Sequence, residues 1–382
     1  MVEKQKNMAS TKSEELYKRV REMAYEKGPD AQLPTMRALC EELKTTRVTL
    51  GEVLQRLEAE QVIYSKSRQG IFVSPRIHTR SIHIFFDLRL LLSTTISPFW
   101  SMLLIYLEQE MQLRNATSNE MYRLHIARPE LNDENTLPSE APKLLQLRQA
   151  DAFVSIGFHS KGWLLEWPVP CVTFAGNGQW IVQLDGLEYG RLAADQLIRQ
   201  GCKRIGIWSR GILPVTSLAS PTEPVQGPYL PLEHLDDFVG FRDELKRQEI
   251  PIHPELMRLP PVLLSRPALT YQEQGYLLAS EVFGSPHQLR PDGLFITDDL
   301  LADGALAAFD DFGIEVKKDV KIVTHTNVGS PILFHRSRHM TIFEFDPEHI
   351  VREMFTVLDT LLAGQQPSQQ VRWIKPRLRL QA

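Results

Sequence analysis

The sequence predicts a multidomain chain of two unlike parts. A small α+β domain of three helices and a β-hairpin precedes a two-lobed α/β domain built on parallel, doubly wound sheets. Three observations lead to this fold class. The chain has 382 residues, more than one typical domain holds. Short helical patterns fill the first 74 residues, and apolar runs alternating with helical segments fill the rest.

The composition is that of a globular protein, and the distribution of charge along the chain suits binding of a polyanion at the N-terminal end. Apolar residues make up 43% of the chain and charged residues 24%, outside the range of disordered proteins. The first 80 residues carry 15 Lys and Arg against 11 Asp and Glu, whereas the remainder carries 28 against 36. A basic head on an acidic body fits a polyanion-binding module joined to a second module.

Three helices and a hairpin are expected in the first 74 residues. Residues 13–27 form one apolar face with Ser13 as the expected N-cap, and Gly28–Pro29 ends that helix. A second helix follows Thr35, and a third begins at Thr46. The inner face of the third helix is expected to hold Leu50, Val53, Leu54 and Leu57. QVIYSKSRQGIFV then alternates around a glycine turn, and three helices with such a hairpin are typical of a winged helix-turn-helix.

Polar side chains remain at the front of the third helix and in the wing. A recognition helix reaches base edges with its N-terminal turn, where Arg47 suits guanine and threonines suit phosphates or a thymine methyl. Arg37 on the second helix suits a backbone phosphate. The alternative is a solvated helix face with capping threonines. The candidate DNA-binding residues are Arg37, Thr46, Arg47, Thr49, Lys66, Arg68 and Gly70.

The stretch LPTMRALCEELKTTRVTLGEVLQRLEAEQVIYSKSRQGIFV resembles the DNA-binding domain of the GntR family of bacterial transcription regulators. The likeness runs through the Leu-Pro pair, the two arginines, LQRLEAE and the wing glycine. It implies that Arg37, Arg47, Thr49 and Gly70 match DNA-contacting positions. Gly51 stands where the family commonly has Arg, so an operator sequence does not carry over.

After a linker at 75–80, strands and helices alternate over the body, residues 81–382. Strands are expected at SIHIFFDL, YRLHIA, DAFVSIG, VPCVTFA, IVQLD, RIGIWS, LMRLP, GLFITD, VKIVTHT, TIFEF and VRWIKPRL. Helices are expected near 98–114, 140–149, 187–200, 236–248, 271–283, 300–312 and 347–363. This alternation indicates βαβ units and parallel sheets, and so many strands favour two lobes. We expect lobe 1 at about 81–178 plus 345–365, and lobe 2 at about 179–330 plus 370–380.

One stretch of the body has the length of a membrane span. Residues 90–107, LLLSTTISPFWSMLLIYL, carry no charge. Five of them are Ser or Thr, and Pro98 lies near the middle. Because proline breaks a helix interior, we expect a strand–loop–helix connection and no membrane partner.

Ligands of such folds bind outside the carboxyl ends of parallel strands and between lobes. Carboxylates accept hydroxyl hydrogen bonds and aromatic rings cover C–H faces, so both suit a polyhydroxylated ligand. The candidate ligand-binding residues are Phe99, Trp100, His159, Asn177, Asp185, Asp237, Asp299, Asn327 and Glu344. For the three aspartates helix capping is the alternative role, and for His159 it is a solvated loop histidine.

The segments LDGLEYGRLAADQLIRQGCKRIGIW, GFRDEL and PDGLFITDDLLADGALAAFDDFGIEVKKDVKIV resemble the effector domain of LacI-type regulators, itself similar to periplasmic sugar-binding proteins. The resemblance implies that the effector cleft is lined by Phe99, Trp100, Asp185, Asp299, Asn327 and Glu344. Asp237 stands where an Arg is common, and Thr326–Asn327 where two Asp are usual. The first exchange argues against an anionic effector and favours a neutral or cationic one.

Other classes of protein fit the sequence less well. HExxH, GxSxG, Walker and Gly-rich dinucleotide motifs are missing, so we predict no enzyme, no metal and no cofactor. Cys40, Cys171 and Cys202 are widely separated, so we expect buried thiols rather than disulfides or a zinc site. MVEKQKNMASTK lacks the apolar core of a secretory signal, and we expect a cytoplasmic protein.

These observations predict a DNA-binding transcription regulator, a repressor, controlled by a small-molecule effector that is a neutral sugar. A homodimer would place two heads on a palindromic operator, and lobe closure would change their spacing. The body alone fits a solute-binding protein of a transport or chemotaxis system as well. The winged helix and the missing signal peptide count against that alternative.

Overall fold

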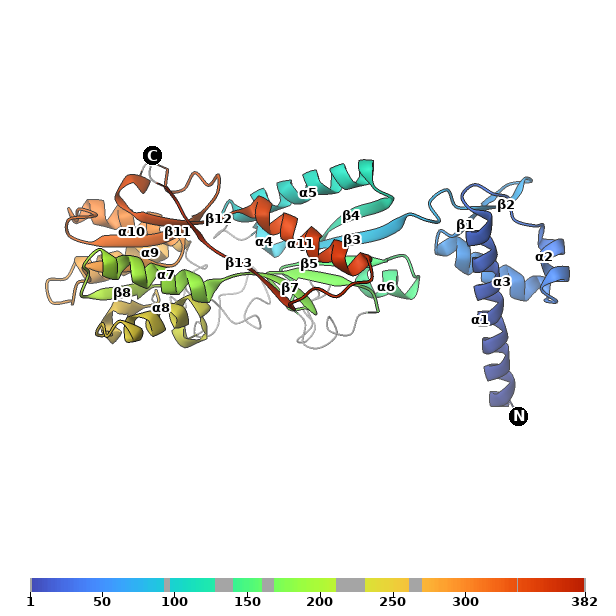
Figure 1. Ribbon diagram of the computed structural model, residues 1–382, viewed down its shortest axis with the longest axis horizontal. Coiled ribbons are helices and arrows are strands. Elements are labelled where there is room, and N and C mark those ends of the chain that lie inside the picture. The colour runs from blue at the N-terminus through green and yellow to red at the C-terminus, as the bar shows by residue number, and fades with distance from the viewer. Residues whose placement is uncertain are drawn as a thin grey trace.

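A computed structural model of the protein describes residues 2–92, 97–127, 140–159, 168–210, 231–260, 270–334 and 336–380. Three parts follow one another along its long axis: an N-terminal head, a first lobe beside it, and a second lobe at the far end (Figure 1). The head comprises residues 2–74, and each lobe is built on its own six-stranded sheet.

The head is the expected winged helix-turn-helix. Its elements are α1 (Val2–Lys27), α2 (Met36–Glu42), α3 (Arg47–Ala59), β1 (Ile63–Lys66) and β2 (Gly70–Val73). Leu50, Val53, Leu54 and Leu57 of α3 are buried, as expected, in one core with Tyr17 and Leu39. The first helix is longer than expected, because it begins at Val2 and not after Ser13. Residues 2–12 contain no Gly or Pro, and a cap preference of about 1 kcal/mol does not end a helix that can continue.

Lobe 1 is built on a wholly parallel sheet. In spatial order its strands are β13 (Val371–Ile374), β7 (Trp180–Leu184), β6 (Cys171–Phe174), β5 (Ala152–Ile156), β3 (Arg80–Asp87) and β4 (Glu120–Ala127). Its described helices are α4 (Arg89–Leu92), α5 (Phe99–Thr117), α6 (Glu140–Gln146) and α11 (Pro347–Leu362). α5 and α11 lie side by side (Figure 1), and Leu103 and Phe355 from them share a core with Ile84 and Val154 of the central strands.

Lobe 2 is parallel except for its last strand. In spatial order its strands are β14 (Arg377–Leu378), β12 (Thr341–Phe345), β11 (Lys321–Asn327), β10 (Gly293–Ile296), β8 (Ile205–Trp208) and β9 (Met257–Arg258). Its described α-helices are α7 (Gly186–Arg199), α8 (Asp236–Arg247), α9 (Tyr271–Phe283) and α10 (Asp299–Asp311). Phe295 packs with α7 and α8, whereas its neighbours Leu294 and Ile296 pack with α9 and α10. Because successive strand residues point to opposite faces, the two helix pairs cover opposite faces of the sheet.

Two strands belong to a different lobe than we expected. Residues from about 179 were assigned to lobe 2, but β7 pairs with β6 and completes the sheet of lobe 1. The last strand was expected to be one element of lobe 2, yet β13 joins lobe 1 and only β14 joins lobe 2. Pro376 lies between them and cannot donate to a ladder. Hydrophobic periodicity identifies a strand but not the sheet that it joins.

Close backbone contact fixes the helix pair α7 and α8. A Cβ on Gly190 would lie 1.9 Å from the carbonyl oxygen of Asp237, and one on Gly240 would lie 2.0 Å from that of Leu187. Only glycine permits this approach at both crossing points. The contact sets the start of α8, including Asp237, directly against α7.

None of the helices in the described ranges is both long enough and apolar enough to cross a membrane. The uncharged run at 90–107 was expected to pass from a strand through a loop into a helix, but its described front part is helical as well. Its front part lies in α4, its rear part lies in α5, and Pro98 is the N-cap of α5.

Lobe 1 contacts the head through a turn that follows α6. The Arg148 guanidinium lies 5.2 Å from the ring centroid of Tyr17, donates to the Tyr17 hydroxyl at 3.4 Å and pairs with Glu14 at 3.6 Å. The Gln149 amide donates to the carbonyl of Ala59, the last residue of α3. The end of α3 is therefore fixed against lobe 1.

Arg148→Ala should loosen the head from lobe 1 without unfolding either part. The lost cation–π contact and ion pair are each worth about 0.5–1 kcal/mol. We expect trypsin to cleave the linker at Arg76 or Arg80 several-fold faster than in the wild-type chain. Arg199→Ala removes another exposed arginine with one ion pair, to Asp195 at 2.8 Å, and should leave cleavage unchanged. Equal cleavage of both variants would show that Arg148 does not hold the head.

Two histidines of lobe 1 lie next to this contact. His83 Nδ1 and His125 Nε2 are 2.8 Å apart, and the rings stack with centroids 5.1 Å apart. His83 Nε2 lies 3.2 Å from the carbonyl oxygen of Gln149. Burial, aided by the charges of His125 and Arg123, lowers the pKa of His83 to about 4, and burial also lowers the pKa of His125. Both rings are therefore neutral at pH 7, and one donates to the other.

The contribution of His83 to the free energy of unfolding should fall as the pH drops from about 6.5 to about 4. The unfolded chain binds a proton at His83 near pH 6.5, whereas the folded chain binds it only near pH 4, so acid favours the unfolded state over this window. A shift of this size corresponds to about 3 kcal/mol. Urea unfolding of wild type and His83→Gln across the window measures the difference, and parallel pH profiles would exclude His83 as the cause.

Candidate functional site

The front of α3 begins with a threonine cap. Thr46 is the N-cap, and its hydroxyl accepts the backbone N–H of Thr49 at 3.3 Å and lies 2.9 Å from the Thr49 hydroxyl. Such a cap stabilises a helix by about 1 kcal/mol. The hydroxyl of Thr46 thus has the capping role that we kept as its alternative, and it presents Arg47 as the first residue of the helix.

Basic side chains near this cap are free to meet a partner. Arg47 is exposed and forms no ion pair with any residue that the structure describes. The side chain of Arg37 is 91% exposed and pairs with Glu41 at 3.1 Å, one turn along α2. Neither arginine is needed for the core of the head, so both are available for an outside anion or base edge.

The wing carries the remaining predicted DNA contacts. Its tip is a tight turn in which Arg68 has φ 64° and Gly70 has φ 121°. Lys66 Nζ lies 4.8 Å from the ring centroid of Phe72, which directs the side chain along the hairpin. Lys66, Arg68 and Gly70 are all exposed.

Packing does not explain Gly51 in the middle of α3. A Cβ at this position meets no atom within 4 Å, and φ is not in the left-handed range. An arginine would therefore fit. Glycine inside a helix costs about 1 kcal/mol relative to alanine, so the structure gives no reason for the residue that departs from the GntR pattern.

Polar residues gather at the carboxyl edge of the lobe 2 sheet. The strands β8, β10 and β11 run parallel, so their ends share one edge. Arg210 follows β8, Asp298 and Asp299 follow β10, and Asn327 ends β11. Arg210 Nη1 lies 3.2 Å from Asp298 Oδ2, and this ion pair joins two of the strand ends.

The adjacent aspartates have different roles. Asp298 is the N-cap of α10 and accepts from the backbone N–H groups of Leu300 and Leu301 at 3.0 and 3.3 Å. Asp299 is fully buried, and its Oδ2 accepts from the hydroxyls of Thr326 at 2.9 Å and Ser330 at 3.3 Å. Its Oδ1 is buried with no partner among the described residues. Burial, followed by the charge of Asp298, raises the pKa of Asp299 to about 7.

Two further buried polar atoms near this edge lack partners. The Tyr189 hydroxyl and His325 Nδ1 make no hydrogen bond within the described part of the chain, and the two rings lie 5.4 Å apart edge to face. Burial raises the pKa of Tyr189 and of Asp237 and lowers that of His325. Buried polar atoms are rarely left unpaired. Together with Asp299 Oδ1 they offer donors and acceptors suited to a hydroxylated ligand.

Lobe 1 brings two of the predicted residues together at its own sheet edge. His159 follows β5 and Asn177 follows β6, and His159 Nδ1 lies 3.4 Å from Asn177 Oδ1.

Two further features lie near the edges of lobe 1. Beside the end of β3 the buried Asp87 forms an ion pair with Arg89 at 2.6 Å, and Arg89 Nη1 is buried with no partner among the described residues. The Met102 methyl group of α5 would lie 2.9 Å from a Cβ on Gly329. Lobe 1 therefore touches lobe 2 next to Ser330.

Other predicted ligand residues have structural partners. Phe99 is buried, with its ring 6.0 Å from Phe174, and Trp100 is half-buried with its ring 6.4 Å from Phe86. Asp185 is the N-cap of α7 and accepts from the Glu188 N–H at 3.0 Å, which is its alternative role. Glu344 forms an ion pair with Arg379 at 2.6 Å. Asp237 is not the N-cap of α8, and its side chain accepts a hydrogen bond from the backbone N–H of Phe238 at 2.8 Å.

Sequence reasoning missed Arg210, Tyr189 and His325. Tyr189 and His325 lie within a helix and a strand rather than after a strand, so a rule based on strand ends does not select them.

Within the described ranges no three His, Cys, Asp or Glu side chains are placed to hold a metal ion. Cys171 and Cys202 are buried, Cys40 is half-buried, and all three are free thiols. The segment 211–233, which departs from the LacI pattern, lies outside the described residues up to 230.

Comparison with protein families confirms both resemblances. Residues 12–73 match the model described as bacterial regulatory proteins, gntR family, and residues 194–381 match a periplasmic binding protein-like domain. Two similar curated proteins are HTH-type transcriptional repressors named PurR. The one from Escherichia coli O139:H28 is 27% identical over 106 residues, which are 28% of this chain. The one from Serratia proteamaculans is 26% identical over the same length. The chain spans 30% of the length of these curated relatives. They are regulators and not enzymes.

Solved structures share the two-lobed fold. A LacI-family regulatory protein from Chloroflexus aggregans has a TM-score of 0.57 at 18% identity, over 79% of this chain and 97% of that one. A LacI-family regulator from Enterococcus faecium with bound ribose has a TM-score of 0.53 at 17% identity, over 79% and 97%. A periplasmic binding protein/LacI regulator from Alkaliphilus metalliredigens, complexed with D-xylulofuranose, has a TM-score of 0.53 at 15% identity, over 79% and 98%.

Proposed function

We propose that this chain, in which a GntR-type winged helix precedes a periplasmic-binding-protein-like body, is a transcription repressor that a neutral sugar controls. One observation carries the proposal. A DNA-reading head with an exposed arginine at the front of α3 is joined to a body that holds unpartnered polar atoms between parallel strand ends. The repressor would act in the cytoplasm, where its operator is.

The head supports contact with double-stranded DNA. Arg47 at the first turn of α3 is the candidate for a guanine edge, and Arg37 is the candidate for a phosphate. Lys66 and Arg68 at the wing tip would follow the backbone into the minor groove. Two heads of a homodimer would read the two halves of a palindromic operator.

The body supports a neutral, hydroxylated ligand. Asp299 Oδ1, the Tyr189 hydroxyl and His325 Nδ1 are the candidate contacts in lobe 2, and His159 and Asn177 are candidates in lobe 1. Asn327, buried at the end of β11, is a further candidate. The carboxyl groups of Asp237, Asp298 and Asp299 all act on the charge of Arg210, and this excess of carboxyl groups over arginine in the described part of the site disfavours an anionic ligand. The ribose and D-xylulofuranose of the two similar structures belong to the same chemical class.

Control of DNA binding would follow from the order of the parts. Lobe 1 contacts the head through Arg148 and Gln149 and contacts lobe 2 through Met102. A sugar that closes the lobes would change the spacing of two heads in a dimer. The coupling is reciprocal, so a sugar that weakens DNA binding must bind the DNA-bound form less tightly.

Two linked measurements test the proposed function. The full chain is first used to select binding sites from a pool of random DNA duplexes, and a palindromic sequence should be enriched. A thermal-shift screen against a sugar panel should then identify a neutral sugar that changes affinity for that sequence. A pool with no enriched sequence would contradict DNA recognition. A sugar that binds without changing DNA affinity would favour a solute-binding protein.

A further inference from the structure

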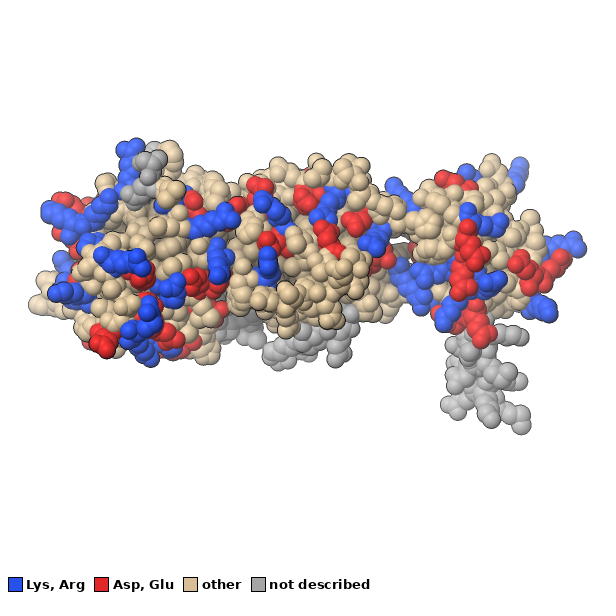
Figure 2. All heavy atoms as spheres, viewed as in Figure 1, with Lys and Arg blue, Asp and Glu red and all other residues tan. Residues whose placement is uncertain are grey.

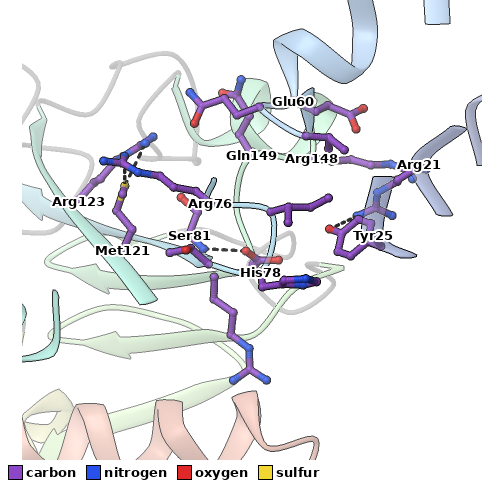
Figure 3. Close-up of a pocket in the computed structure, with 16 residues that line it drawn as sticks. Arg21, Tyr25, Glu60, Arg76, His78, Ser81, Met121, Arg123, Arg148 and Gln149 are labelled. Atoms are coloured by element: carbon purple, nitrogen blue, oxygen red, sulfur yellow. Dashed lines mark hydrogen bonds between the residues drawn. The ribbon is translucent and has the colours of Figure 1, made fainter. Parts of the chain in front are cut away.

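A cavity of about 270 Å³ lies where the head, the linker and lobe 1 meet (Figure 3). The head contributes Arg21 and Tyr25 of α1 and residues 60–62 after α3. The linker contributes residues 76–79, and lobe 1 contributes the starts of β3 and β4 and the turn at Arg148. None of these residues belongs to the proposed sugar site or to the predicted DNA contacts.

The lining of this junction cavity has an excess of positive charge. It includes Arg21, Arg76, Arg80, Arg123 and Arg148, against the carboxylates of Glu60 and Asp151. Both carboxylates are engaged: Glu60 accepts from the Tyr17 hydroxyl and from Arg56 at 3.2 Å, and Asp151 accepts from the Ser81 N–H at 2.7 Å. Figure 2 shows basic side chains on both sides of the junction.

Three of the arginines have no carboxylate partner among the described residues: Arg21, Arg76 and Arg123. Arg76 Nη1 and Arg123 Nη2 both donate to the sulfur of Met121 at 3.3 Å, as dashed lines in Figure 3 mark. The two nitrogens thus lie no farther apart than twice that distance. A thioether is a weak acceptor, so these donors are poorly satisfied. Arg21 Nε is buried with no partner in the described part of the chain.

An anion would stabilise this arrangement. Guanidinium groups held so close repel one another, and donors left without acceptors in a partly enclosed site cost free energy. The planar forks of two arginines match the oxygens of a phosphate group in paired hydrogen bonds. We propose that the junction cavity is a second ligand site, which binds a small phosphate-bearing anion between the head and lobe 1.

Size and position favour a free anion over the phosphate backbone of DNA. The cavity is slightly smaller than most ligand pockets, which suits one or two phosphate groups. It is lined by residues that follow the end of α3, whereas Arg47 lies at the start of that helix. Thirteen helical residues separate these points by about 20 Å, so the cavity lies well away from the part of α3 that is expected to contact bases.

A bound anion would strengthen the docking of the head. It would join Arg76 of the linker and Arg123 of lobe 1 to Arg21 of the head, beside the contact made by Arg148. An anion that binds more tightly when the head is docked on lobe 1 makes undocking of the head less favourable. Because such coupling is reciprocal, it also shifts every other binding equilibrium that moves the head. The site is separate from the sugar site, so the two ligands would act on the head from different places.

Calorimetric titration of the full chain with inorganic pyrophosphate tests the site. Wild type should bind one pyrophosphate per chain, and the double variant Arg76→Gln/Arg123→Gln should bind at least tenfold more weakly. Arg338→Gln is the matched control, because Arg338 is an exposed arginine of lobe 2 and should not affect binding. Thermal unfolding shows whether the double variant is folded. If it is not, Arg76→Gln alone, at an exposed linker position, is measured in its place.

Two results would overturn the proposal. One is the absence of pyrophosphate binding by wild type. The other is equal pyrophosphate binding by the double variant and the control. If that double variant also binds DNA more weakly and with a shallower salt dependence, these arginines belong to the contact with the DNA backbone.

Discussion

Arg47→Ala is expected to abolish sequence-specific DNA binding while the head stays folded. Arg47 is exposed at the first position of α3 and has no partner within the described residues, so its removal leaves the core unchanged. A bidentate contact with guanine is worth about 1–3 kcal/mol. Two heads on one operator lose it twice, so we expect affinity to fall roughly 30-fold or more. Fluorescence anisotropy with the selected duplex and a scrambled duplex, at one fixed salt concentration, measures the change.

The matched control for this prediction is Arg19→Ala. Arg19 is an exposed arginine on α1 that pairs with Glu22 at 3.5 Å, outside the predicted DNA contacts. It should keep operator affinity, and both variants should keep the thermal shift that a sugar produces. Operator affinity equal to wild type in Arg47→Ala would refute the role of Arg47.

Asp299→Ala is expected to remove the sugar response and to leave DNA binding without sugar intact. Asp299 is fully buried, its Oδ2 is held by Thr326 and Ser330, and its Oδ1 has no partner in the described part of the chain. Leaving the partner of a buried hydrogen bond unsatisfied costs about 1–3 kcal/mol, so sugar affinity should fall about 5-fold to 150-fold. Asp310→Ala, an exposed carboxylate on the same helix that pairs with Arg336 at 2.9 Å, should have no effect on the sugar-induced thermal shift. Wild-type sugar affinity in Asp299→Ala would show that Asp299 makes no ligand contact.

The raised pKa of Asp299 gives the same residue a second signature. The folded chain holds a proton on Asp299 up to about pH 7, whereas the unfolded chain loses it near pH 4. The contribution of Asp299 to the free energy of unfolding should therefore fall as the pH rises from about 4 through 7, opposite in direction to the contribution of His83. Asp299→Asn should remove this contribution from the pH profile and be no less stable than wild type at pH 8. Identical profiles would mean that Asp299 ionises as freely in the folded chain as in the unfolded one.

Local pattern was enough to predict the head. Leu50, Val53, Leu54 and Leu57 are buried on α3 as their spacing requires, and Thr35 and Thr46 cap the helices that they precede. These features depend on residues a few positions apart. The start of α1 was predicted wrongly, because a possible cap at Ser13 cannot show whether the residues before it continue the helix.

In the body, the alternation of strands and helices predicted two parallel sheets, and the helices from α7 to α11 begin and end within two residues of their expected bounds. The candidate ligand residues fared differently. The rule that selected strand ends correctly placed Asp299 and Asn327 at the carboxyl edge of the lobe 2 sheet, and their role in ligand binding stays a prediction. The same rule selected Phe99, which packs in the core, and Glu344, which pairs with Arg379. A position directly after a strand predicts that a side chain lies near the edge of the sheet. It does not predict whether that side chain already packs against, or pairs with, another residue of the protein.

The sequence by itself determined the order of the parts, the elements within them and the chemistry available to each. Only the tertiary structure decided that β7 and β13 complete lobe 1, that Asp298 rather than Asp299 caps α10, and that Tyr189 and His325 lie beside them. It also decided that arginines from the head, the linker and lobe 1 meet at one cavity. The physical reason is the separation along the sequence of the residues that interact. Hydrophobic periodicity and helix capping depend on residues within one or two helical turns of one another. Sheet membership and shared burial depend on contacts between residues far apart in sequence.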